Sequence, residues 1–84
     1  MSPEQSRAAR AWLDVSQEHL AKEAGVSLST VRDFEKGRRV PIPATLAAMR
    51  AVLESEGVGF SFAVEDGRSY ACGITFSRPG KLDA

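Results

Sequence analysis

The chain has 84 residues, 43% of them hydrophobic, and its eleven basic and eleven acidic residues give a formal net charge of zero. This length allows one small domain with a single core, which a second subunit often helps to stabilise. The balanced charge argues against a polycation that coats nucleic acid without regard to sequence, but it leaves room for a local basic patch.

The first predicted helix starts near the amino terminus. Ser2 is a good N-cap, Pro3 suits the first helical position, and Gln5 stands where a capping box needs it. We expect this helix to run to about Asp14. Its predicted inner face, with the tryptophan as the largest apolar anchor, comprises Ala8, Ala11, Trp12 and Val15.

Residues 17 to 36, QEHLAKEAGVSLSTVRDFEK, predict two short helices that meet at a tight turn. Ser16 caps the first of them, and Gly25 ends it because glycine enters the left-handed backbone region without steric cost. Val26 is predicted to fill the corner. The small and apolar residues that share one face of this first helix are Leu20, Ala21 and Ala24.

The second of these helices is the candidate reader of DNA. Ser27 is its predicted N-cap, and Val31 and Phe34, three residues apart, form its buried stripe. Gly37 supplies the stop. The amino-terminal turn of this helix would then face outward.

A fourth helix is predicted to begin at Ile42-Pro43 and to end before Gly57. After Gly57 the apolar period changes from about 3.6 to 2, which predicts two strands. The Asp66-Gly67 pair between them tolerates positive φ, so the strands should form a hairpin. The residues that alternate along the two strands are Val58, Phe60, Phe62 and Val64, then Tyr70, Cys72, Ile74 and Phe76.

The aromatic residues of the hairpin need a surface to cover them, because an isolated hairpin is marginal in water. We favour a symmetric dimer through the hairpin, and the alternative is a monomer whose hairpin folds onto its own helices. Cys72, the single cysteine, is expected to be a small core residue. The predicted dimerisation residues are Phe60, Phe62, Tyr70, Ile74 and Phe76.

The segment QEHLAKEAGVSLSTVRDFEK, with SQEHLA at its start and FEKGRRVP at its end, resembles the lambda-repressor-like helix-turn-helix family (Cro/C1 type, XRE). The resemblance covers roughly residues 5 to 55 and implies a four-helix bundle. With the hairpin that the period predicts after Gly57, the expected fold is mainly α: a four-helix bundle followed by a C-terminal β-hairpin. We therefore divide the chain into a helix-turn-helix DNA-binding domain (1–56), a β-hairpin for dimerisation (57–77) and a flexible tail (78–84).

The resemblance also implies which positions meet DNA. Arg32 can bind guanine O6 and N7 together, Leu28 can pack on a thymine methyl, and Asp33 can accept from a base or instead hold a cation such as Arg32. The full predicted base-reading set is Ser27, Leu28, Ser29, Arg32 and Asp33.

Phosphate contacts fix register without carrying sequence information. Gln17 leads the candidates because it opens a helix, where free backbone N–H groups and its side-chain amide can jointly meet a phosphate. The predicted phosphate-binding set is Gln17, Thr30, Lys36, Arg38 and Arg39. By resemblance, Arg10 and Glu35 form a structural ion pair between the first helix and the reading helix.

We interpret the chain as a sequence-specific transcriptional regulator, a homodimeric repressor that reads the major groove of a palindromic operator on double-stranded DNA. The alternative is an antitoxin or similar protein whose hairpin engages another polypeptide. His19 is the single histidine, and no spacing assembles metal ligands or a nucleophile with its base, so we expect no enzyme activity and no cofactor. The absence of a signal pattern and of long apolar runs favours a cytoplasmic protein without a membrane segment.

Overall fold

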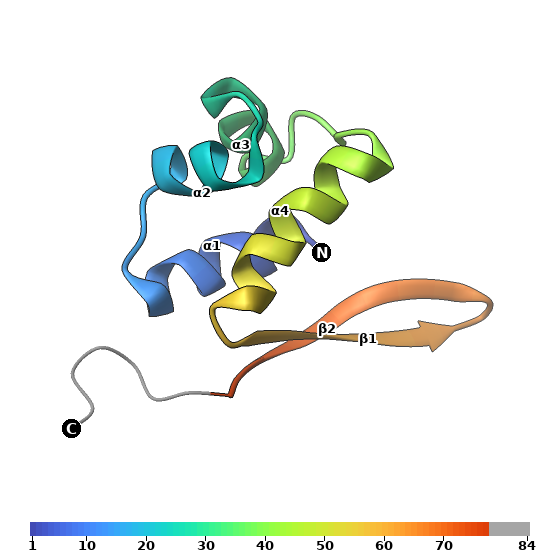
Figure 1. Ribbon diagram of the computed structural model, residues 1–84. Helices are drawn as coiled ribbons and strands as arrows, with labels where there is room; N and C mark the ends of the chain where they lie inside the picture. Colours follow the sequence, from blue (N-terminus) through green and yellow to red (C-terminus); the bar gives the residue numbers. More distant parts are fainter. Residues whose placement is uncertain (78–84) are drawn as a thin grey trace.

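The computed structural model describes residues 1–77 as four helices followed by a two-stranded antiparallel sheet (Figure 1). The predicted fold class, a four-helix bundle with a C-terminal β-hairpin, is confirmed. The tail expected at 78–84 lies outside the described residues. The elements are α1 (Pro3–Leu13), α2 (Gln17–Ala24), α3 (Leu28–Glu35), α4 (Pro43–Ser55), β1 (Val58–Glu65) and β2 (Arg68–Phe76).

Serine hydroxyls cap the first three helices, as predicted. Ser2 Oγ accepts from the Gln5 N–H at 3.0 Å, and Gln5 Oε1 accepts from the Ser2 N–H at 2.9 Å, which completes a capping box. Ser16 and Ser27 accept from the backbone N–H three residues further on. These local hydrogen bonds fix where each helix begins.

Residues in the left-handed region end α1 and α2. Gly25 ends α2 with a φ of 70°, and no atom lies within 4 Å of the place a Cβ would occupy. The glycine is therefore needed for its backbone conformation and not for space. Asp14 ends α1 with a φ of 58°, a conformation that aspartate tolerates better than most residues.

One hydrophobic core joins the helices to the base of the hairpin. Its buried members are Ala9, Leu20, Ala21, Val31, Phe34, Met49, Leu53 and Val58. The predicted stripe of α3, Val31 and Phe34, is confirmed. None of the helices within residues 1–77 is long and apolar enough to cross a membrane.

The predicted inner face of α1 was wrong. Ala8 and Ala11 are exposed, and the buried residues of this helix are Gln5, Ser6 and Ala9. Gln5 and Ser6, although polar, can occupy the inner face because each is hydrogen-bonded to a distant part of the chain. Trp12, expected in the core, is 44% exposed and stacks on a strand residue instead.

The hairpin has the predicted two-residue Asp66-Gly67 turn, with both residues at positive φ. The register changes within the ladder: Ser61 pairs with Gly73, whereas the next residue, Phe62, pairs with Ala71. β2 therefore carries one extra residue, Cys72, and this bulge shifts the alternation along the strand.

The bulge corrects two expectations about β2. Tyr70 pairs with Ala63, so it lies on the face opposite to Phe62 and not on the same face as Ile74. Cys72 is exposed and is not a core residue. A one-residue slip moves side chains to the other face, and the sequence pattern alone did not locate it.

The base of the hairpin packs on the helices of its own chain. Phe60, Ile74 and Phe76 contact the core, and the Phe76 ring stacks on Trp12 with centroids 4.3 Å apart. Gln5 Nε2 donates to the carbonyl oxygens of Ser61 (3.2 Å) and Gly73 (2.7 Å), which ties α1 to both strands. The far half of the hairpin extends beyond the helices (Figure 1).

Candidate nucleic-acid interface

The candidate interface is the outer side of α3. This helix follows α2 after the turn at Gly25 and packs against it. Leu20 and Ala21 of α2 and Val31 and Phe34 of α3 are buried against one another in the core. The opposite side of α3 must therefore face solvent. The Val26 N–H donates to the Ala21 carbonyl at 2.9 Å, which closes the corner between the two helices.

All five predicted base-reading residues lie at or near this outer side. Ser27, Ser29 and Arg32 are exposed, and Leu28 and Asp33 are partly exposed. In the described part of the chain, Arg32 forms no ion pair with Asp33, so the alternative in which Asp33 holds Arg32 is not what the structure has. The Arg32 guanidinium can therefore be directed toward a base.

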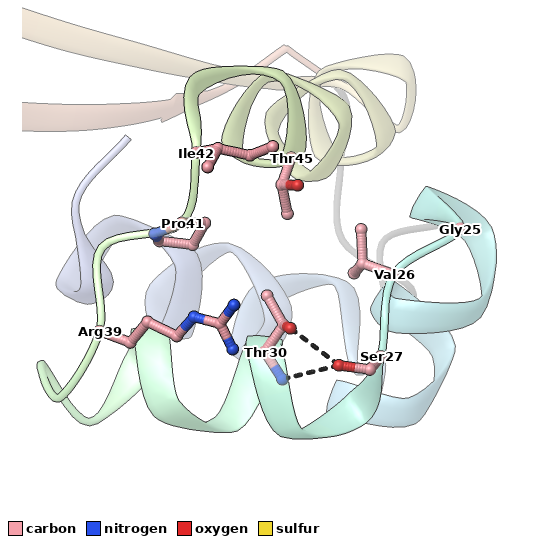
Figure 2. Close-up of a pocket in the computed structure, with 8 residues that line it drawn as sticks. All are labelled: Gly25, Val26, Ser27, Thr30, Arg39, Pro41, Ile42 and Thr45. Carbon is pink, nitrogen blue, oxygen red and sulfur yellow. Dashed lines mark hydrogen bonds between the residues drawn. The ribbon is translucent and has the colours of Figure 1, made fainter.

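Ser27 and Thr30 are joined by two hydrogen bonds at the start of α3. Ser27 Oγ lies 2.8 Å from Thr30 Oγ1 and 3.2 Å from the Thr30 N–H (Figure 2), and 3.1 Å from Ser29 Oγ. Thr30 is 8% exposed. Its hydroxyl thus helps to fix the first turn of the reading helix, and its contact with phosphate stays a prediction.

The Glu35 carboxylate, at the end of α3, is the centre of a buried polar cluster. Arg10 donates from Nε to Oε2 at 2.9 Å and from Nη2 to Oε1 at 2.6 Å, so the ion pair implied by the resemblance is present in bidentate form. Ser6 Oγ donates to Oε2 at 2.6 Å, and Gln17 Nε2 donates to Oε1 at 3.0 Å. The cluster therefore joins α1, α2 and α3.

The cluster keeps Glu35 charged although its side chain is only 2% exposed. Burial alone raises the pKa of this carboxyl, but hydrogen bonds from Arg10, Ser6 and Gln17 outweigh that effect and hold the pKa below its ordinary value. The hydrogen bond with Glu35 in turn raises the pKa of Arg10. Arg7, which the sequence analysis did not single out, donates from its guanidinium to the Glu35 carbonyl.

Gln17 is held in place by its hydrogen bond with Glu35. One N–H of its side-chain amide is engaged there, so the second amide N–H and the backbone N–H groups at the start of α2 are its available routes to phosphate. Ser16 accepts hydrogen bonds from the N–H of His19, through its hydroxyl, and from the N–H of Leu20, through its carbonyl. The N–H groups of Gln17 and Glu18 precede these two in the first turn of the helix. The phosphate contact predicted for Gln17, through these backbone groups and its amide, stays a prediction.

The three cationic residues after α3, Lys36, Arg38 and Arg39, are all exposed. Arg39 reaches back toward α3, and its guanidinium points at Thr30 (Figure 2). It lines a hollow of about 290 Å³ between the α2–α3 turn, the α3–α4 loop and the start of α4. The lining residues are Gly25, Val26, Ser27, Thr30, Arg39, Pro41, Ile42 and Thr45.

Thr45 is a polar residue of this hollow that the sequence analysis missed. It lies in the first turn of α4, which begins at Pro43 after Ile42 and has no side-chain cap. Its position in the first turn of the helix that follows a basic segment was the available signal. The hollow thus combines a guanidinium, threonine hydroxyls and a helix start at the border of the candidate interface.

Within residues 1–77, no group of three or more His, Cys, Asp and Glu side chains is placed to hold a metal ion. His19 Nε2 lies 3.8 Å from Glu56 Oε1 on an exposed surface. The candidate interface thus consists of exposed hydrogen-bonding and cationic side chains on and beside a short helix.

A short helix that is buried on one side, exposes Ser29 and Arg32 on the other and follows its predecessor across a glycine turn has the geometry of a helix-turn-helix. A helix-turn-helix family model matches residues 7–57. The chain therefore belongs to the lambda-repressor-like, Cro/C1-type helix-turn-helix family, as its sequence indicated, and it is a DNA-binding transcription regulator of that type. No match to a curated protein was found.

Proposed function

We propose that this protein is a homodimeric repressor that places α3 of each subunit in the major groove of a near-palindromic operator. The observation that carries the proposal is the two-sided character of α3. Val31 and Phe34 are buried, whereas Ser29 and Arg32 are exposed on the other side. A helix fixed in this way can enter the major groove, where each base pair shows a distinct pattern of donors, acceptors and methyl groups.

Each exposed residue at the start of α3 has its own chemistry. Arg32 is the strongest candidate for specificity, because a guanidinium can donate to guanine O6 and N7 together. Leu28 packs on a thymine methyl, and Ser29 donates or accepts without selecting one base. Ser27 and Asp33 complete the base-facing set, with Ser27 also serving as the helix cap.

Phosphate contacts on both sides of α3 set its register in the groove. On one side are the backbone N–H groups at Gln17, at the start of α2. On the other side are Lys36, Arg38 and Arg39 and the hollow that contains Thr30 and Thr45. This distribution gives the neutral chain a local cationic footprint and a salt-dependent affinity.

A dimer is proposed because one short reading helix contacts only one half-site. Two subunits related by a twofold axis place their reading helices one turn of DNA apart, about 34–36 Å, on an inverted repeat. The hairpin (57–77) is the proposed dimerisation element. The protein would act in the cytoplasm, where it meets double-stranded DNA, and would repress by occupying the operator.

Selection of bound duplexes from a random DNA pool at about 0.15 M salt tests the proposal, because specific binding persists there while nonspecific binding is suppressed. Enrichment of inverted repeats with half-sites about 10 bp apart is the expected result. Arg32→Ala is the test variant, and it should lose the preference for one base pair in each half-site. No enrichment by folded protein would overturn the proposal.

A further inference from the structure

The far half of the hairpin leaves apolar side chains exposed in a single subunit. Phe62 is 39% exposed, Val64 73% and Tyr70 48%. Arg50 covers part of the Phe62 ring, with its guanidinium carbon 5.2 Å from the ring centroid. No helix lies over the tip of the hairpin in Figure 1.

The outer edge of β1 also has backbone groups directed away from β2. Glu65 and Arg68 flank the two-residue turn and form a hydrogen-bonded pair, and such pairs alternate with non-hydrogen-bonded pairs along an antiparallel ladder. The N–H and C=O groups of Val64 and Phe62 therefore point outward. In residues 1–77, no backbone hydrogen bond joins this edge to another element.

The two edges of the hairpin differ in how well they are protected. β2 carries the bulge at Cys72. Bulges and edge charges are the usual features that prevent strand addition. β1 runs for eight residues with no proline, no lysine and no inserted residue, and its one charged residue, Glu65, is the last.

We infer that the outer edge of β1 pairs antiparallel with β1 of a second copy, so that two hairpins form one four-stranded sheet across the twofold axis. The inference rests on the proposed homodimer and specifies its interface. The inferred interface consists of the outer edge of β1 together with Phe62 and Val64. Phe60, Ile74 and Phe76, which were predicted to lie in the interface, are left out because they already pack on the helices of their own chain.

A second copy fits this edge because the edge is complementary to itself. In antiparallel pairing about a twofold axis, each outward N–H of one strand meets an outward C=O of the identical strand. Glu65 stands at the end of β1, so the two copies of this carboxylate are carried to opposite ends of the joint. The Phe62 and Val64 side chains of both copies then lie on one face of the joined sheet and cover each other.

The pairing also limits the register. Outward backbone groups lie on alternate residues of β1, so the two strands can slide only in steps that keep these groups opposed. Registers that centre the joint on the part of β1 beyond the helices place the twofold axis at Ser61, Phe62 or Ala63. Ser61 and Ala63 have their side chains on the face opposite to Phe62, which makes them suitable for cross-linking without disturbing the apolar contact.

Disulfide cross-linking tests the interface. In a Cys72→Ser background, Ser61→Cys and Ala63→Cys proteins are oxidised separately and as an equimolar mixture, without DNA. Ser69→Cys is the matched control, since Ser69 pairs with Val64 on the other edge of the same hairpin. Opposed β1 strands bring cysteines within bonding range, so one of the three samples should form at least about tenfold more cross-linked dimer than the control.

A proline pair provides a second measurement that does not depend on cysteine chemistry. Val64→Pro removes an outward N–H of β1 and leaves the ladder with β2 intact, whereas Ser69→Pro does the same on β2. Val64→Pro should raise the dimer dissociation constant at least about tenfold in sedimentation analysis, and Ser69→Pro should leave it within about twofold. Equal effects of the two variants would overturn the inference.

The outcomes separate the interface from the proposed function. If the Cys72→Ser protein is dimeric and binds the selected operator but cross-links only at position 69, or at none of the tested positions, the interface is wrong and the repressor proposal stands. If the protein stays monomeric at about 100 µM and selects no operator, both fail. A protein that is monomeric alone and instead pairs through β1 with a different polypeptide also overturns the inference.

Discussion

Gln17 Nε2 donates a hydrogen bond to Glu35 Oε1 at 3.0 Å, so the first residue of α2 is joined directly to the last residue of α3. The start of α2 is a proposed phosphate contact, and α3 is the proposed reading helix. One hydrogen bond between them, supported by Arg10 and Ser6, fixes the position of α3 relative to this proposed phosphate contact. Changes at Glu35 should therefore affect both folding and DNA binding.

Glu35→Gln should lower the free energy of unfolding by about 3 kcal/mol, because it leaves the Arg10 guanidinium without its charged partner in a largely buried site. Urea denaturation measures the change. Glu54→Gln is the control: Glu54 pairs with Arg50 four residues earlier on the exposed side of α4, and its loss should cost less than about 1 kcal/mol. A loss of similar size in both variants would contradict the structural role of the cluster.

The pH dependence of stability follows from the lowered pKa of Glu35. Because the pKa in the folded state lies below the ordinary value of about 4.3, the ionised carboxylate stabilises the fold fully above that pH. The stabilisation is lost as the pH falls through the folded-state pKa. Thermal unfolding between about pH 7 and pH 3 should show this acid loss in the native protein, and a smaller one in Glu35→Gln. Parallel curves for the two proteins would count against it.

Arg32→Ala should weaken binding to the selected operator by about 1–3 kcal/mol and relax the preference at one base pair in each half-site. Fluorescence anisotropy with the operator and with each single-position variant measures both effects. Unfolding of the variant should match the native protein, because Arg32 is exposed. An equal loss on all duplexes would make Arg32 a phosphate contact and not a base contact.

Arg39→Ala should weaken binding to all duplexes by a similar factor and leave the base preference unchanged. Its guanidinium lies in the hollow beside α3 and provides charge without sequence information. The slope of log affinity against log salt should fall by about one unit. Titrations at several salt concentrations give this slope, and an unchanged slope would remove Arg39 from the phosphate set.

Trp12→Ala should loosen the base of the hairpin, since it removes the stacking partner of Phe76. The stacking itself should contribute about 0.5–1.5 kcal/mol, in addition to the apolar area that the ring covers. Trp12 is also the single tryptophan, so its fluorescence in the native protein reports hairpin docking directly. Phe76→Leu should shift that fluorescence, whereas Val64→Ser at the far end should not.

Local signals in the sequence were sufficient for the helices and for the turn of the hairpin. Ser16, Ser27 and Gly25 act within a few residues of themselves, so their roles could be predicted without knowing the rest of the fold. The buried face of α1 could not. Gln5 and Ser6 are buried because of partners 29 to 68 residues away, and an apolar pattern cannot show such partners.

The same distinction applies to the candidate site. The exposed positions of α3 follow from its buried stripe and from the family resemblance, and the structure places them on the outer side as expected. The bond between Gln17 and Glu35, and the hollow that brings Thr45 to Arg39, join residues from separate helices. The bulge at Cys72 is a third feature of this kind, because two chemically reasonable registers differ by a single residue.

Gln5 and Ser6 are neighbours on α1, and they bind two separate parts of the chain, the hairpin and the end of α3. Gln5 binds the carbonyls of Ser61 and Gly73 in the hairpin, and Ser6 binds the carboxylate that ends the reading helix. One turn of α1 thus connects the hairpin to the end of the reading helix through side-chain hydrogen bonds. A chain cut after residue 57 would remove both protein acceptors of the Gln5 amide, so we expect a replacement for the hairpin to dock on α1 only if it offers acceptors at the same place or if position 5 is changed with it.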